Sequence, residues 1–168
     1  MTPSEVSARR ALASLRELAC RYRADEVRPE DLPMRSAEAL AAGLDTPALC
    51  ELAGLPRNTD TRDIRDVFEQ ALRESGVELP ALALARRHGL RRLAARLLDG
   101  SVTLAGLATD DGWDTEAGTA EERSFVALIP PCACCLEYTV GLDPAAWAAE
   151  VRVAALALVA SPRDRTDC

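Results

Sequence analysis

A strict helical stripe of apolar residues in the middle of the chain constrains the fold more than any other feature. Ile64, Val67, Phe68, Ala71 and Leu72 recur at intervals of three and four, which places them on one face of an α-helix. Only 4% of the residues are aromatic, so a core must be built mainly from Leu, Ala and Val. That composition suits closely packed helices and leaves a β-sheet short of its preferred residues.

Proline and glycine divide the rest of the chain into further helical segments. The pairs Thr46-Pro47 and Asp143-Pro144 each combine an N-cap with a proline in the first helical position. A kink or a break is expected at His88-Gly89, because glycine costs about 1 kcal/mol in a helix interior. The predicted helices cover about 5–23, 33–43, 47–54, 61–75, 80–99, 119–128 and 144–160. We therefore expect one all-α domain over residues 1–162, an irregular bundle of about seven helices, with a disordered polar tail over 163–168.

An internal similarity suggests a second arrangement of the same helices. The segment 15–21 aligns with 90–96, and at the same offset Val27 matches Val102 and Leu32 matches Leu107. Two stacked helix-turn-helix units would explain this similarity. The alternative is that helices rich in Leu, Ala and Arg resemble each other through composition alone.

Two segments also resemble known proteins. Residues 32–55, with Leu32-Pro33 and Leu52-Ala53-Gly54-Leu55, and residues 93–113, with Leu97-Leu98-Asp99-Gly100, are similar to uncharacterised small helical proteins of actinobacteria. The chain departs from them at Leu104, where a proline is usual, and at Leu107-Ala108, which keeps only part of a Gly-Ala pair. The resemblance covers about two-thirds of the chain. It implies the fold and no catalytic residue, because the shared positions are helix caps and core positions.

Charge and hydropathy exclude several classes of function. The formal net charge of −7 argues against a general nucleic-acid-binding protein, which needs a basic surface. The longest apolar stretch, Val153 to Ala160, is far shorter than the roughly 20 residues of a membrane span and predicts the end of a core helix. The N-terminal residues show no apolar signal core, so the six cysteines are expected to be free thiols in the cytoplasm.

The cluster Cys132-Ala133-Cys134-Cys135 is the first candidate for chemistry. A zinc site commonly uses pairs of Cys or His ligands two to four residues apart, and the only histidine, His88, lies far away in the sequence. We therefore expect the cluster to be structural, with a metal-binding or redox site at Cys132, Cys134 and Cys135 as the alternative. Cys20 and Cys50 are expected to lie in the core. No cofactor is expected.

The second candidate is an acidic loop that carries a tryptophan. Asp110, Asp111, Trp113 and Asp114 do not fit the spacing of a calcium loop, but together they could contact a protein partner. In the alternative, the loop is solvated and Trp113 covers the core. The segment 85–100 carries five Arg and one acid, a net charge of +4, and we expect these Arg to pair with acids of the same chain.

These observations favour a protein that acts by binding another protein, such as a regulatory or immunity-type partner with an acidic surface. Catalysis is not expected, because no phosphate-binding loop, zinc-hydrolase or nucleophile-elbow motif occurs. A thiol-dependent metal or redox protein and an enzyme of unrecognised type remain the alternatives. The sequence does not indicate the oligomeric state.

Overall fold

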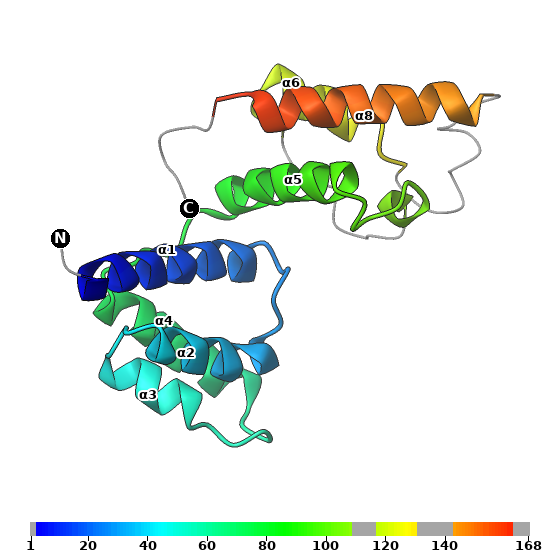
Figure 1. Cartoon of the computed structure of the whole chain (residues 1–168). Coiled ribbons are helices and arrows are strands. Elements are labelled where there is room, and N and C mark those ends of the chain that lie inside the picture. The colour runs from blue at the N-terminus through cyan, green and yellow to red at the C-terminus, as the bar shows by residue number, and fades with distance from the viewer. Residues whose placement is uncertain (1–2, 109–116, 131–142, 163–168) are drawn as a thin grey trace. The chain divides into compact units, whose positions relative to one another are not determined.

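The computed structural model describes residues 3–108, 117–130 and 143–162, and within these ranges the chain is helical and has no β-strand (Figure 1). Seven α-helices and two short 3₁₀-helices account for this part of the chain. In order they are α1 (Pro3–Arg23), η1 (Pro29–Asp31), α2 (Leu32–Ala41), α3 (Pro47–Ala53), α4 (Thr61–Glu74), α5 (Leu82–Leu98), η2 (Ala105–Ala108), α6 (Ala120–Val126) and α8 (Pro144–Ala160). The expected all-α fold is thus confirmed.

The helix boundaries follow the capping residues seen in the sequence. The Thr46 side chain accepts a hydrogen bond from the Leu49 amide at the start of α3, and Asp143 accepts from the amides of Ala145 and Ala146 at the start of α8. Of the kink or break expected at His88-Gly89, the break is wrong, because α5 runs through both residues. Gly89 is buried, so packing around this turn outweighs its modest helix-breaking cost.

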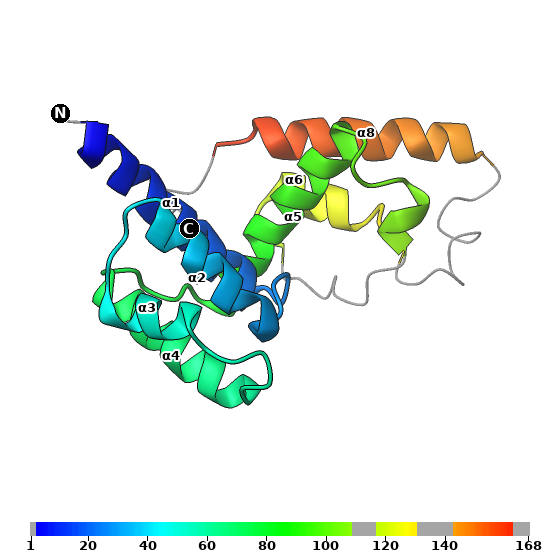
Figure 2. The ribbon, with the colours of Figure 1, turned by 60° about the horizontal axis from the view of Figure 1, so that its bottom comes forward.

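The chain divides into two compact units, with the boundary at Ala85 near the start of α5. In the first unit α2 packs on α3 and α3 packs on α4, as the views in Figures 1 and 2 show. Its core joins residues of α1, α2, α3 and α4 around Phe68, which is fully buried and meets the ring of Tyr22 edge-on at a centroid distance of 5.0 Å. The helical stripe predicted for α4 is therefore the centre of this core.

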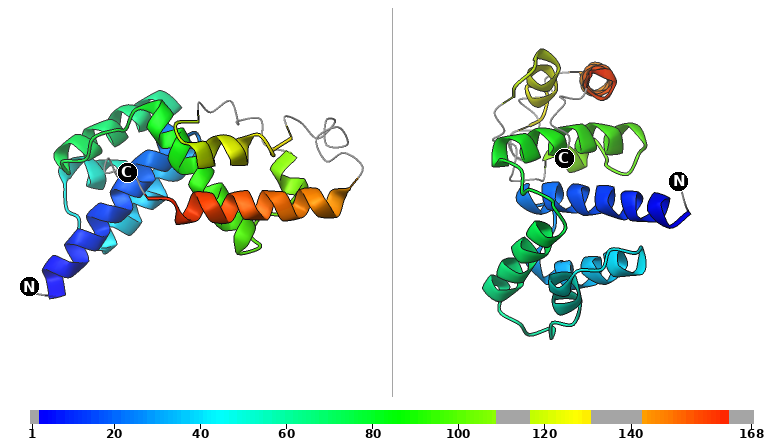
Figure 3. Two further views of the ribbon diagram at one scale, coloured as in Figure 1. Left: turned by 90° about the horizontal axis from the view of Figure 1, so that it is seen from above. Right: turned by 90° about the vertical axis from the view of Figure 1, so that its left-hand side faces the viewer.

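The second unit has its own core, formed by α5, η2, α6 and α8. In the right-hand view of Figure 3, α8 is seen nearly end-on, with α6 beside it and α5 below. Phe125 of α6 and Val151 of α8 are fully buried in this core. The indole nitrogen of Trp147 donates a hydrogen bond of 3.0 Å to the carbonyl oxygen of Leu128, which joins α8 to the end of α6.

Some helices of the first unit have counterparts of similar length and capping in the second unit. Both α3 and α6 are seven residues long, and each begins after a threonine in extended conformation whose hydroxyl accepts a backbone hydrogen bond. Leu49 and Leu52 are the buried residues of α3 at the positions that Glu122 and Phe125 occupy in α6. The chain also reverses after α1 and α5 at equivalent positions, where Asp25 and Gly100 have φ angles of 61° and 82°.

The correspondence is closest between α4 and α8. Both begin after an aspartate N-cap, Asp60 or Asp143. At a constant offset of 83 residues the buried positions coincide, pairing Ile64 with Trp147, Phe68 with Val151, Ala71 with Ala154 and Leu72 with Ala155. The two helices thus share a cap and a pattern of burial over these four positions, and the duplication suggested by the sequence stays a prediction.

Other expectations about the whole chain stay predictions. The single domain expected over residues 1–162 and the stacking of two units are not decided by the division described above. The tail over 163–168 lies outside the described residues. Among the helices that the structure describes, none has an apolar stretch long enough to cross a membrane.

Candidate functional site

The most unusual surface in the described part of the chain is one side of α8. Val153, Leu156 and Val159 are 66%, 57% and 45% exposed, although all three are aliphatic. The helix carries only two charged residues, Glu150 and Arg152, among its 17 residues. A helix that is apolar all round is normally covered on every side. Among the described residues, the neighbours of this helix bury only the side that faces the core of the second unit.

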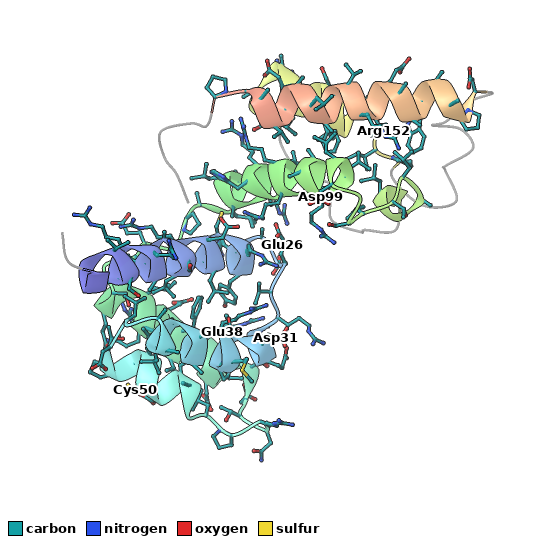
Figure 4. All side chains as sticks on the ribbon, viewed as in Figure 1. Glu26, Asp31, Glu38, Cys50, Asp99 and Arg152 are labelled. Atoms are coloured by element: carbon teal, nitrogen blue, oxygen red, sulfur yellow. The ribbon has the colours of Figure 1, made fainter. Side chains whose placement is uncertain are left out.

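We call the exposed line formed by Ala149, Val153, Leu156 and Ala160 the α8 stripe. These residues follow one another at intervals of four, three and four, so they form a continuous line along the helix. Arg152, labelled on α8 in Figure 4, is exposed and directly precedes Val153 in the sequence. The expectation that residues 153–160 form the end of a core helix is confirmed, because Ala154, Ala155 and Leu158 of this segment lie in the core, but the other five residues are exposed.

The equivalent side of α4 shows that the fold does not require an apolar surface there. At the offset of 83 residues, Val153 corresponds to Gln70 and Leu156 corresponds to Arg73. All four side chains are exposed, and α4 carries seven charged residues where α8 carries two. The buried halves of the two helices are alike while their exposed halves differ in chemistry. The difference therefore concerns what each surface meets outside its own unit core.

A buried ion pair lies in the core of the second unit. The Arg87 Nε donates to both carboxylate oxygens of Glu122 at 2.9 and 3.1 Å, and Glu122 is 1% exposed. The same carboxylate accepts from the amides of Gly118 and Thr119, which completes a capping box at the start of α6. Burial alone would raise the pKa of Glu122, but the hydrogen bonds from Arg87, Gly118 and Thr119 outweigh it and lower that pKa. The group is a stable carboxylate with its partners in place, and its role is structural.

A second arginine of this region, Arg91, also serves the fold. Arg91 donates four hydrogen bonds at the end of α8, to the carbonyl oxygens of Leu158, Ser161 and Pro162 and to the Ser161 hydroxyl. It thereby satisfies carbonyl groups that a helix end leaves without partners. The expected pairing of the 85–100 arginines with acids is confirmed for Arg87, whereas Arg91 binds backbone carbonyls.

One groove of about 550 Å³ lies between α1 and α2 in the first unit. Its walls include Arg10, Glu17, Arg21, Arg35 and Glu38, so both charge signs are present. Arg35 and Glu38 neutralise each other at 3.1 Å. The groove therefore offers no set of like charges or converging donors for a particular ligand.

The residues singled out in the sequence have different outcomes. Asp110, Asp111, Trp113 and Asp114, and also Cys132, Cys134 and Cys135, lie outside the described residues, so their roles stay predictions. His88 lies partly buried in the middle of α5. No group of three potential metal ligands occurs among the residues that the structure describes.

Two expectations about cysteine are wrong. Cys50 is exposed, because α3 turns Ala48, Leu49 and Leu52 inward and leaves Cys50 on the opposite side (Figure 4). Cys20 is buried as expected, but it is disulfide-bonded, so its thiol is not free. Its bonding partner lies outside the described residues.

Sequence reasoning missed the α8 stripe, although a signal was present. The segment from Val153 to Ala160 was noticed for its apolar character, but a continuous apolar run has no sidedness of its own. Alignment of α8 with α4 would have exposed the difference, because the aspartate caps fix the offset between them. Comparisons with protein-family models, with curated proteins and with solved structures find no match for the chain.

Proposed function

We propose that this protein acts without catalysis, by binding another protein, and that the α8 stripe is part of its binding surface. The observation that carries the proposal is the exposure of Val153 and Leu156 on a helix whose counterpart, α4, has Gln70 and Arg73 at the same positions. Exposed apolar side chains in a continuous line typically mark interaction sites on soluble proteins. The surrounding chain is acidic, with a net charge of −7, which favours selection among partners by charge.

The acidic loop remains a second predicted contact. Asp110, Asp111 and Asp114 could increase the rate of association with a basic partner, and Trp113 could anchor it. This assignment comes from the sequence alone, because the loop lies outside the described residues.

A comparison of three forms of the full chain tests the proposal. The double variant Val153→Gln/Leu156→Arg gives α8 the exposed side chains of α4 at the corresponding positions and leaves the buried side unchanged. Met34→Gln is the matched control, because Met34 is also 66% exposed but lies on α2. Each form is immobilised, exposed to an extract of the native host cells, and its bound proteins are quantified by mass spectrometry.

We expect the wild type and Met34→Gln to retain the same proteins and the double variant to lose them by at least about thirtyfold, which corresponds to about 2 kcal/mol. Equal retention by all three forms would contradict a role for the α8 stripe. A purified wild-type chain that turns over a substrate would contradict the non-catalytic function itself.

A further inference from the structure

The α8 stripe has a symmetry that indicates which partner it fits. Two large residues, Val153 and Leu156, lie in the middle of the stripe, and a small residue lies at each end, Ala149 and Ala160. Their spacing of four, three and four is the same in both directions along the helix. Two copies of α8 related by a twofold axis perpendicular to the helix, midway between Val153 and Leu156, therefore place large side chains opposite large ones and small side chains opposite small ones. Self-complementarity of this kind is what a twofold interface between identical chains requires.

We propose that the α8 stripe binds the α8 stripe of a second copy of this chain, with the two helices antiparallel. In this pairing Val153 meets Leu156 of the second copy, and Ala149 meets Ala160. The four-three-four spacing is that of alternating core positions in a coiled coil, so the large side chains fit between neighbouring side chains of the facing helix. The small residues at both ends allow the two backbones to remain close along the whole stripe.

The charges of α8 agree with this partner. The chain as a whole is strongly acidic, so most surfaces of two copies repel each other. α8 is an exception, because its Glu150 and Arg152 balance. In the antiparallel pairing Glu150 lies level with Val159 of the second copy and Arg152 lies level with Ala157. No charge on one helix then faces a like charge on the other, and no partner of opposite charge is required.

The expected strength of association follows from the size of the stripe. Stable protein interfaces bury about 1,200–2,000 Å² in total, and a seam of four residues on each helix is smaller than that. We therefore expect a dissociation constant in the range of about 10 µM to 1 mM, and a dimer that forms in a concentration-dependent way.

Sedimentation equilibrium on the full chain between about 1 µM and 1 mM tests this inference. We expect the wild type and Met34→Gln to approach twice the monomer mass as concentration rises. Val153→Gln/Leu156→Arg should remain monomeric with an unchanged circular dichroism spectrum, since α4 folds with the same two side chains at these positions. A wild type that stays monomeric, or a dimer that the double variant leaves intact, would overturn the inference.

The antiparallel direction has a test of its own. In Val153→Glu/Leu156→Lys, each Glu meets a Lys of the second copy if the helices are antiparallel, whereas like charges meet if they are parallel. Val153→Glu/Leu156→Glu brings like charges together in either direction. The Glu/Lys form should dimerise about tenfold more tightly, which corresponds to about 1.4 kcal/mol. Equal or reversed affinities would overturn the antiparallel arrangement.

This inference rests on the proposed function, and the two can fail separately. If the wild type is monomeric but its capture of other proteins still depends on Val153 and Leu156, the homotypic pairing is wrong and the binding function stands. If neither self-association nor capture depends on these residues, both are wrong.

Discussion

Within the core of the second unit, one charged pair occupies positions that the first unit fills with leucine. Arg87 and Glu122 correspond to Leu12 and Leu49 when α5 is aligned with α1 and α6 with α3. Removal of one partner from a buried ion pair leaves the other charge without compensation, whereas replacement of both by apolar residues is often neutral. The pair also explains why residue 118 is glycine, since a Cβ there would lie 2.6 Å from the guanidinium carbon of Arg87.

Substitutions of this pair should therefore be strongly non-additive. Arg87→Leu or Glu122→Leu alone should lower the free energy of unfolding by about 3 kcal/mol, at the lower end for buried pairs because the Arg87 side chain is partly exposed. The double variant leaves neither charge without its partner, although it still lacks the capping carboxylate, so its loss should be clearly smaller than the sum of the two single losses. Chemical denaturation of the four forms measures this, and additive losses would show that the two charges stabilise the fold independently.

The same carboxylate predicts how stability depends on pH. The pKa of Glu122 is lowered in the folded state, so its contribution is present above the pKa of the unfolded chain, about 4.3, and is lost as pH falls through the folded value. The difference in unfolding free energy between the wild type and Glu122→Gln should be constant near neutral pH and shrink below about pH 4. A difference that does not change between pH 7 and pH 3 would contradict the lowered pKa.

At the scale of single helices, the sequence predicted well where the helices begin and end, but poorly which of their side chains are exposed. Caps such as Thr46 and Asp143 depend on local chemistry, so the starts of α3 and α8 were predictable. The continuity of α5 through Gly89 depends on tertiary packing, which a propensity scale omits. The exposed side of α8 was missed because every candidate on it is apolar. In the sequence, only the comparison with α4 distinguishes the buried side of α8 from its exposed side.

The apolar pattern that predicted α4 also predicts the position in this helix where a substitution costs most stability. Phe68 is fully buried and packs edge-on against Tyr22. Phe68→Ala should lower the free energy of unfolding by about 3–5 kcal/mol, because it removes a large side chain and leaves a cavity. Thermal or urea denaturation provides the measurement. A loss below about 1 kcal/mol would show that the core does not centre on this residue.

At the scale of the whole molecule, helices of the first unit share caps and buried positions with helices of the second unit, whereas their exposed sides differ. The sequence showed part of this similarity, in the match of 15–21 with 90–96, because buried leucines occupy corresponding positions in α1 and α5. The match of α4 with α8 could not be seen in the sequence, because most of their paired buried residues differ in type and agree only in being buried. The candidate site, the α8 stripe, lies on this helix pair, whose similarity the sequence did not show.

The two units have separate clusters of core residues, which predicts additive effects across them. Ile64→Val in the first core should cost about 0.5–1.5 kcal/mol, and Val151→Ala in the second should cost about 1.6 kcal/mol for two buried methylene equivalents. Because the residues share no cluster, the double variant should lose the sum within about 0.5 kcal/mol. A larger coupling energy, measured in a double-mutant cycle by urea denaturation, would show that the two cores act as one.

The central claim is that the α8 stripe serves binding and does not hold the fold together. The most direct test compares the melting temperature of Val153→Gln/Leu156→Arg with that of Val151→Ala, in full chains at low concentration where self-association adds no stability. Val151 is fully buried on the opposite side of the same helix, so its loss should lower the melting temperature by about 3–6 °C. The double variant should melt within about 1 °C of the wild type. A double variant that melts as low as Val151→Ala would contradict the claim, because it would place Val153 and Leu156 in the packed interior of the chain.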